Sequence, residues 1–264
     1  MRIVTFNVNS IRARLHLLPD WLDRAQPDVL CLQELKCEAG DFPMELFASR
    51  GYHVALHGQK TYNGVAIASR TPLADVRTGL PLDGDAEARG IAVRTAGLHI
   101  VNLYVVNGKS VGDPKYAHKL RWLDALVDWV GQSCSPTEAL VVCGDFNIAP
   151  TDADTWDAAA WHGSVLCSEA ERAPFQRLLD WGLHDAFRSL YPDAFGRYAH
   201  TWWDYRGAGF PRGHGLRIDH HLVTAPVLAR ATAVEIDRDM RKSDKASDHA
   251  PVTLVLRGEG AASG

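Results

Sequence analysis

The sequence has few cysteines, and none of them is paired in the way that metal sites require. Its five cysteines are scattered at positions 31, 37, 134, 143 and 167, and no two of them form a Cys-x-x-Cys pair. This spacing gives no support to a zinc ribbon or a disulfide framework. We therefore expect buried, reduced thiols in a cytoplasmic protein.

Long apolar runs and a surplus of positive charge are also missing. No uninterrupted apolar segment approaches the ~20 residues that a membrane helix needs, and Arg2 to Val8 has the pattern of a strand rather than of a signal peptide. We expect neither secretion nor a membrane span. The 28 basic and 32 acidic residues give a formal charge of −4, which argues against a protein that binds nucleic acid through net charge alone. A nucleic-acid partner stays open, because local patches steer binding.

Several common catalytic motifs are incomplete. Gly108-Lys109-Ser110 ends like a phosphate-binding P-loop, but Leu103 stands where that loop needs its first glycine. Gly207-Ala208-Gly209 begins a dinucleotide fingerprint, but Arg212 stands in place of its third glycine. The sequence has neither Gly-x-Ser-x-Gly nor His-Glu-x-x-His, which removes support for serine hydrolases and zincins.

Apolar, β-rich segments recur along the chain and predict strands. They are Arg2–Val8, Asp28–Gln33, Tyr52–His57, Gly64–Ser69, Gly90–Thr95, Leu98–Val106, Ala139–Gly144, Arg217–Thr224, Ala231–Ile236 and Ala250–Leu256. Helical spacing predicts one helix from Ser10 to Ala25 and another after Asp113-Pro114. Shorter helices are predicted at Phe175–Trp181 and His184–Leu190.

This mixture of strands and helices predicts an α/β fold. Several strands are close enough in sequence to form hairpins, so we expect two packed sheets flanked by helices. With 46% hydrophobic and 23% charged residues, the 264-residue chain can bury a full core. No Pro/Gly-rich linker divides it, and we expect one domain over residues 1–257 with a flexible tail at 258–264.

The strongest chemical pattern follows the predicted strand at Ala139–Gly144. In Gly144-Asp145-Phe146-Asn147, the side chains of Asp145 and Asn147 share one face of an extended chain while Phe146 points to the other. An acid beside an amide can orient a water or an oxyanion. A strand end followed by an Asx turn is the ordinary alternative.

Other polar side chains also stand at strand ends. Glu34 closes the apolar strand Asp28–Gln33, and Asn7 lies near the end of the first strand. Asp248-His249 precedes the last strand, and Asp219 opens another and can fix an imidazole tautomer. Alone, each is an ordinary cap or surface group. Together, hard oxygen donors without a cysteine cluster favour Mg²⁺ or Mn²⁺ and a phosphate ester.

Five motifs in this chain, taken in order, resemble the exonuclease III family of abasic-site endonucleases, within the endonuclease/exonuclease/phosphatase superfamily. They are Phe6-Asn7-Val8-Asn9, Leu32-Gln33-Glu34, Gly144 to Pro150, Arg217-Ile218-Asp219 and Ser247 to Pro251. The likeness extends from Arg2 to Arg257, and it is specific because all five keep their order and spacing. It implies a four-layered α/β sandwich.

The resemblance also implies a set of roles. The implied metal ligands for Mg²⁺, with Mn²⁺ as a substitute, are Glu34 as the main ligand and Asn7, Asp145, Asn147 and Asp248. The implied catalytic residues are Tyr104, Asn107, Asp145, Asn147, Asp219 and His249. Among these, Asp145 would position or deprotonate the attacking water. His249, oriented by Asp219, would stabilise the charge that develops on the phosphate.

The implied substrate is double-stranded DNA with abasic sites or blocked 3′ ends. Cleavage on the 5′ side of the lesion would leave a 3′-hydroxyl, alongside 3′-5′ exonuclease and 3′-phosphatase activity, and we expect a monomer. The implied DNA contacts are Asn9, Lys115, Lys119, Trp202, Trp203, Arg206 and Arg217. For the two tryptophans, core packing is the alternative.

Two features depart from the family pattern. Leu35 replaces the usual threonine after Glu34, a change expected to leave the metal site intact. Trp161 or His162 is hypothesised to crowd the pocket for a flipped-out abasic sugar and so to favour 3′-end trimming, although an ordinary surface loop is the alternative. A non-DNA phosphodiesterase and a non-catalytic binding module are the other interpretations.

Overall fold

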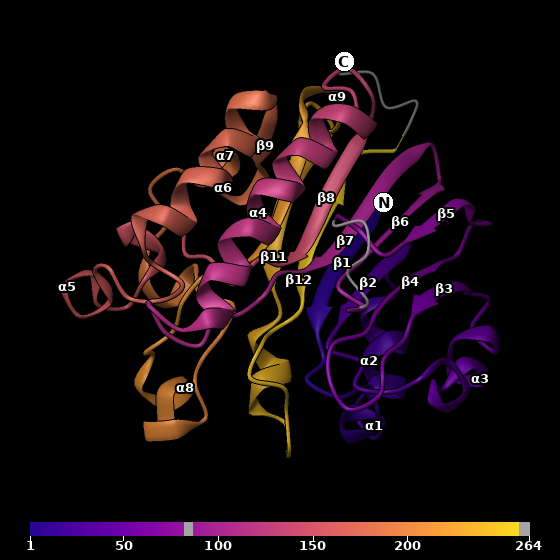
Figure 1. Ribbon diagram of the computed structural model, residues 1–264. Helices are drawn as coiled ribbons and strands as arrows, with labels where there is room; N and C mark the ends of the chain where they lie inside the picture. Colours follow the sequence, from indigo (N-terminus) through magenta and orange to yellow (C-terminus); the bar gives the residue numbers. More distant parts are fainter. Residues whose placement is uncertain (82–86, 259–264) are drawn as a thin grey trace.

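Two six-stranded sheets form the centre of the computed structural model, which describes residues 1–81 and 87–258 (Figure 1). The first sheet has the order β11 (Ala231–Ile236), β12 (Val252–Leu256), β1 (Arg2–Asn7), β2 (Val29–Gln33), β4 (Val65–Ser69) and β3 (His53–His57). The second has the order β5 (Ala74–Thr78), β6 (Gly90–Thr95), β7 (Leu98–Tyr104), β8 (Leu140–Asp145), β10 (Asp219–Thr224) and β9 (Leu183–Asp185). Apart from Gly258, the predicted tail lies outside the described residues.

Helices α4 and α6 lie against the outer face of the second sheet, and α1, α2 and α3 pack against the first, while α5 and α8 project away from both sheets (Figure 1). The helices of the described residues are α1 (Ile11–Arg14), α2 (Leu18–Ala25), α3 (Met44–Ala48), α4 (Pro114–Ser133), α5 (Ala158–Trp161), α6 (Glu169–Trp181), α7 (Ala186–Leu190), α8 (Gly209–Arg212) and α9 (Ala225–Leu228). Short 3-10 turns are η1 (Ala39–Asp41), η2 (Asp152–Asp154), η3 (Gly196–Tyr198), η4 (Arg206–Ala208) and η5 (Arg238–Lys242). In the described part of the chain, no helix is both long and apolar enough to cross a membrane.

Strand alternation explains the layers. In β8, Val141 and Cys143 face the core between the sheets, while Leu140 and Val142 join the apolar cluster beneath α4 and α6. β2 alternates in the same way between the central core and the cluster that includes residues of α1, α2 and α3. Both faces of these strands are therefore apolar, as their near-continuous hydrophobic sequence predicts.

Three predicted helices need correction or extension. The segment Ser10–Ala25 forms two helices, because Pro19 has no amide hydrogen and its ring would clash with the carbonyl one turn earlier in a continuous helix. The helix predicted at Phe175 begins earlier, at Glu169, with a capping box between Ser168 and Glu171. The helix predicted at His184–Leu190 was wrong at its start: Leu183–Asp185 is strand β9. The helix after Asp113-Pro114 is confirmed.

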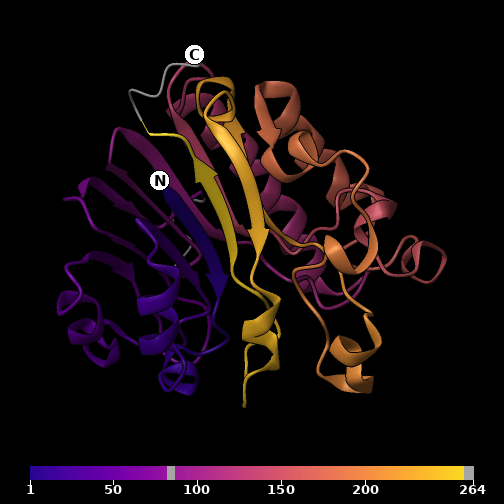
Figure 2. The ribbon, with the colours of Figure 1, turned by 180° about the vertical axis from the view of Figure 1, so that it is seen from behind.

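The first and last strands of the chain lie side by side. β1 pairs with β12 in antiparallel and with β2 in parallel orientation (Figure 2). In the other sheet β7 and β8 are parallel, and β10 runs antiparallel to β8 with Asp219 opposite Asp145. The carboxyl ends of β1, β2, β7 and β8 therefore meet near the amino end of β10. This is the position in α/β folds where ligands bind.

Candidate active site

Asn7 connects two carboxylates that come from different sheets. Its Nδ2 donates to Glu34 Oε1 and to Asp145 Oδ2, each at 2.9 Å. Asn7 lies at the end of β1, Glu34 directly after β2, and Asp145 at the end of β8. The amide thus holds together two acids that would otherwise repel each other.

Hydrogen bonds from Asn147 and Asn107 fix the geometry around Asp145. The main-chain amide of Asn147 donates to Asp145 Oδ1 at 2.9 Å, which is the Asx turn expected from the sequence. The Asn147 side chain donates to Asp145 Oδ2 at 3.2 Å and to the carbonyl of Val105 at 3.0 Å. Asn107 Nδ2 in turn donates to Asn147 Oδ1 at 3.0 Å. Each amide therefore has a fixed orientation before any ligand arrives.

His249 lies between two buried acids. Its Nδ1 is 2.9 Å from Asp219 Oδ2, and its Nε2 is 3.7 Å from Asp145 Oδ2. The main-chain amide of Asp219 donates to Thr201 Oγ1 at 3.1 Å. The imidazole is thus held in one orientation with Nε2 directed at Asp145.

Burial and charge shift the proton affinities of this trio in opposite directions. Burial raises the pKa of Asp145 to about 7, reinforced by the charges of Asp219 and Glu34 and opposed by His249. Burial alone would lower the pKa of His249, but the charges of Asp219 and Asp145 outweigh it and raise that pKa to about 10. At neutral pH the imidazole is therefore protonated, and Asp145 is poised to hold or release a proton.

Tyr104 stands at the end of β7, beside the two acids. Burial, together with the negative charges of Glu34 and Asp145, raises the pKa of its hydroxyl well above the ordinary value. The hydroxyl therefore stays protonated and can act as a donor. The guanidinium of Arg89 lies over its ring, 5.1 Å from the centroid, and restricts the ring's position.

Asp248 is held by donors from two loops. Its Oδ1 accepts from Asn9 Nδ2 at 2.9 Å and its Oδ2 accepts from Trp202 Nε1 at 3.0 Å. Ser247, the preceding residue, donates from its hydroxyl to the carbonyl of Asn7 at 2.7 Å. The loop before β12 is thus attached directly to the loop after β1.

Strained backbone gathers at this edge of the sheets. Asn9, Glu34, Lys36 and Asn147 all have positive φ angles, of 44°, 51°, 54° and 51°. Gly144 has φ of 141°, and a Cβ there would lie 1.9 Å from the carbonyl oxygen of Leu103. Only glycine fits this position, so the strand can deliver Asp145 next to β7. Such clustering of strain is typical of functional sites.

Comparison with known proteins places this geometry in a family. A sequence profile described as the Endonuclease/Exonuclease/phosphatase family matches residues 4–249. The chain belongs to this family. It is 36% identical to exodeoxyribonuclease III of Haemophilus influenzae, over 96% of this chain and 98% of that protein.

Solved structures agree with this assignment. A 3′ phosphatase from Neisseria, bound to a product DNA hairpin, superposes with a TM-score of 0.94 at 43% identity, covering 98% of this chain and all 100% of that one. An AP endonuclease from Archaeoglobus fulgidus gives 0.93 at 36% identity, with coverages of 98% and 100%. The predicted exonuclease III-like family, the two-sheet α/β fold and the prediction of a nuclease hydrolase are confirmed.

Three of the residues predicted to contact DNA are buried. Lys119 has no exposed surface and pairs with Glu171. Arg217 is 1% exposed and pairs with Asp154 and Asp185 at 2.7 Å each. Trp203 is fully buried and packs edge-on against a phenylalanine of α8. Each of these side chains is enclosed by protein partners, which supports a structural role, and their contact with DNA stays a prediction.

The other predicted DNA contacts lie at the surface or beside the site. Lys115 and Arg206 line a cleft of about 530 Å³ together with Tyr104 and Asn107. Trp202 is partly buried and joins a small apolar cluster against which Trp161 also packs. His162 is exposed at the end of α5, and Asn9 is held by Asp248 as described.

Lys36 is the main site residue that sequence reasoning missed. Its Nζ lies 2.8 Å from Glu34 Oε2 and donates to Asn9 Oδ1 at 2.5 Å. A lysine two residues after a strand-end acid was the available signal. Thr201 was missed as well. Its hydroxyl accepts hydrogen bonds from the main-chain amides of Ile218 and Asp219.

The donor set fits a divalent cation. Ligand atoms of Glu34, Asp145 and His249 all lie within 4.8 Å of one another. The two carboxylates are hard oxygen donors, as Mg²⁺ and Mn²⁺ prefer. Burial, together with the charges of Asp219 and Glu34, raises the pKa of Asp145, and a cation beside this carboxylate would stabilise its charged form. His249 is unsuited as a ligand, because it carries a proton and already contacts Asp219.

Proposed function

We propose that this protein is a Mg²⁺-dependent DNA-repair phosphodiesterase. It cuts on the 5′ side of abasic sites to leave a 3′-hydroxyl, and it removes nucleotides and phosphates from 3′ ends of duplex DNA. The proposal rests on one observation: a cation site and an acid–base pair lie side by side. Asn7 connects Glu34 to Asp145, and Asp145 in turn faces His249. The nuclease relatives support DNA as the substrate.

Asp145 and His249 divide the acid–base work. Asp145 positions the attacking water and accepts its proton. His249, protonated and oriented by Asp219, donates a hydrogen bond to a phosphate oxygen and stabilises the charge that develops there. Tyr104 and Asn107 supply neutral donors on the opposite side of the phosphate.

Glu34 and Asp145 would hold the cation directly, with Asn7 holding both carboxylates in place. Asp248 uses both oxygens for Asn9 and Trp202, so in this arrangement it would contribute through its charge. When bound, the cation neutralises the phosphate and stabilises the departing oxygen. The carboxylate of Glu34 would contact both the cation and the ammonium group of Lys36.

The cleft beside Tyr104 fits a DNA strand. Four of its lining side chains are positive, those of Arg89, Lys109, Lys115 and Arg206, and one is acidic, that of Glu87, which pairs with Arg89 at 2.6 Å. Positive groups of this kind contact phosphates without reading the base sequence. Damaged DNA of any sequence would therefore be accepted.

The main test uses two end-labelled duplexes, one with an internal abasic-site analogue and one with a 3′-phosphate at a nick. Both are incubated with Mg²⁺ or with a chelator. We expect metal-dependent reaction on both, and a loss of roughly 100-fold or more in kcat for Asp145→Asn. Asp180→Asn, an exposed acid on α6, serves as the matched control. Absence of metal-dependent reaction on either duplex would contradict the proposal.

A second candidate is the same enzyme acting chiefly on 3′ ends. Its support is the 43% identity to the Neisseria 3′ phosphatase and the position of Trp161 against the apolar cluster that also includes Trp202. In this version Trp161 or His162 narrows the pocket for an abasic sugar. His162→Ser should then raise incision relative to phosphate release. An unchanged ratio of the two activities would leave His162 an ordinary surface residue.

A further inference from the structure

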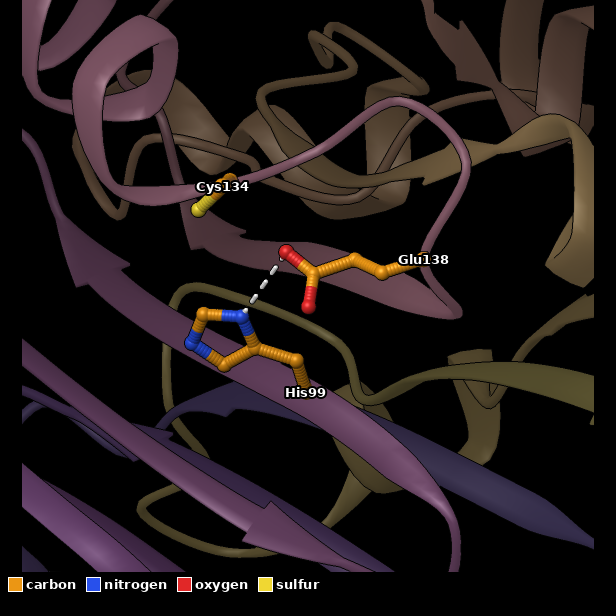
Figure 3. Close-up of side chains that lie close together, drawn as sticks. All are labelled: His99, Cys134 and Glu138. Carbon is orange, nitrogen blue, oxygen red and sulfur yellow. Dashed lines mark hydrogen bonds and ion pairs between the residues drawn. The ribbon is translucent and has the colours of Figure 1, made fainter.

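Three metal-ligating side chains meet at the opposite end of the central strands from the active site. His99 lies at the start of β7, Cys134 directly follows α4, and Glu138 precedes β8 (Figure 3). Their ligand atoms all lie within 4.8 Å of one another, and His99 Nδ1 is 3.3 Å from Glu138 Oε1. Nothing in the proposed reaction uses these residues.

The main chain holds all three in place. The main-chain amide of His99 donates to the carbonyl of Ala139 at 2.9 Å. The main-chain amide of Cys134 donates to the carbonyl of Val130 at 3.0 Å. Glu138 Oε1 accepts the amide of Ser135 at 3.0 Å, which closes the short loop between α4 and β8. The three side chains are therefore held close together before a metal ion binds, which lowers the entropic cost of binding the ion.

The donor types point to zinc. A thiolate, an imidazole and a carboxylate are the ligands that tetrahedral Zn²⁺ accepts, with a water in the fourth position, whereas Mg²⁺ takes oxygen ligands. Zinc bonds of about 2.0–2.3 Å place ligand atoms roughly 3.5 Å apart, so the side chains need to close by only about 1 Å. We propose that His99, Cys134 and Glu138 form a Zn²⁺ site.

Cys134 differs from the other cysteines in its exposure. It is partly exposed, whereas Cys31, Cys37, Cys143 and Cys167 are buried. Burial and the nearby charge of Glu138 raise the pKa of the Cys134 thiol to about 12, so zinc binding at neutral pH displaces one proton from sulfur.

A guanidinium competes with the cation. Arg94 contacts Glu138 Oε2 at 3.1 Å, and its side chain is 51% exposed. The Nε atom of Arg94 is also 3.6 Å from Asp75 Oδ2. Arg94 therefore keeps an acidic partner when Glu138 binds zinc. Burial lowers the pKa of His99, helped by the charges of Arg94 and Arg77 and opposed by Glu138, and this favours the neutral imidazole that a metal requires. Removing Arg94 should consequently tighten zinc binding.

The test is a cobalt titration of the metal-free full-length protein. Co²⁺ bound by Cys134 should give a thiolate-to-metal charge-transfer band, and Zn²⁺ should abolish it while excess Mg²⁺ should not. Cys134→Ser should remove the band, and His99→Gln should weaken binding by roughly tenfold or more. Arg94→Gln should tighten it. Zinc should raise the Tm of the wild type but not of Cys134→Ser.

Matched controls separate this site from the active site and from general thiol binding. Cys37→Ser and His184→Gln, at positions remote in sequence from the cluster, should keep the band and the affinity. Glu34→Gln should also keep both, since it alters only the catalytic cluster. A band that survives Cys134→Ser, or that is lost in Glu34→Gln, would overturn the proposal. So would the absence of any band in the wild type.

Discussion

At the scale of single residues, Lys119 is a buried cation that supports two catalytic amides. Its Nζ donates to the carbonyl of Asn147 at 2.6 Å, to that of Asn107 at 3.2 Å, and to Glu171. Lys119→Met should lower the free energy of unfolding by about 3–5 kcal/mol, because the buried carboxylate of Glu171 would lose its cationic partner and keep only the hydrogen bonds from Leu166 and Ser168. It should also reduce kcat, since both carbonyls lose their shared donor. Urea unfolding and steady-state kinetics measure the two effects.

Lys115 is the matched control on the same helix. It is exposed, so Lys115→Met should change the free energy of unfolding by less than about 0.5 kcal/mol. It should instead weaken DNA binding and reduce its salt dependence. The double variant of Lys119→Met with Glu171→Gln should recover part of the stability but not the activity. Wild-type stability of the single Lys119→Met variant would contradict the role of the buried pair.

The two lysines also show which site residues a sequence can reveal. Glu34 and Asp145 were identifiable because each follows an apolar strand, a position that depends only on nearby residues. The burial of Lys119 depends on Glu171, which is distant in sequence and reaches it only when α4 packs against α6. The burial of Arg217 could not be predicted for the same reason, since its partner Asp154 lies in another loop.

At the scale of elements, the segment that leads into β10 places two adjacent tryptophans in different environments. Trp203 is fully buried, whereas Trp202 is partly buried and donates to Asp248. Trp203→Ala should lower the free energy of unfolding by about 3–5 kcal/mol through the cavity that it leaves. Trp202→Phe should leave stability within about 1 kcal/mol, because it preserves most of the ring, but it should lower kcat by freeing Asp248.

Chemical unfolding and incision kinetics of the same two variants test this difference. Trp202→Phe removes one N–H group, so its effect on kcat isolates the hydrogen bond to Asp248. Equal losses of stability in both variants would mean that the tryptophans share one structural role. An unchanged kcat in Trp202→Phe would show that Asp248 does not need this donor.

Elements with strong apolar patterns were predictable, and weak ones were not. β2 and β8 were identified because both of their faces are buried. β5 was missed because every one of its residues is exposed at the edge of its sheet, so no alternation marks it. β9 was missed because it has only three residues. Its pairing with β10, rather than its own sequence, makes it a strand.

At the scale of the whole molecule, the interior that joins the sheets contains polar groups as well as apolar ones. Gln33 Nε2 donates to Asn102 Oδ1 at 2.6 Å, and Asn102 donates to the carbonyls of Leu32 and Ala66, each at 2.9 Å. These bonds connect β2 and β4 of one sheet to β7 of the other. They fix the relative position of the two sheets whose ends carry Glu34 and Asp145.

The buried parts of the protein also contain neutral histidines, which make stability fall in acid. Burial lowers the pKa of His200 and His220 to about 4 and that of His221 to about 3. In the unfolded chain an imidazole binds its proton near pH 6.5. Between these pKa values the unfolded state binds more protons, so stability falls as the pH drops below about 6.5.

His221→Leu tests this linkage at one site. The loss of unfolding free energy between pH 7 and pH 5 should be smaller by about 2 kcal/mol than in the wild type, because one proton-binding group is removed from the unfolded state. Urea unfolding at the two pH values gives the difference directly, whatever the variant's stability at pH 7. His184→Gln removes an exposed histidine from β9 and should leave the difference unchanged. If His221→Leu also left it unchanged, the imidazole would have to titrate alike in the folded and unfolded states, which its burial opposes.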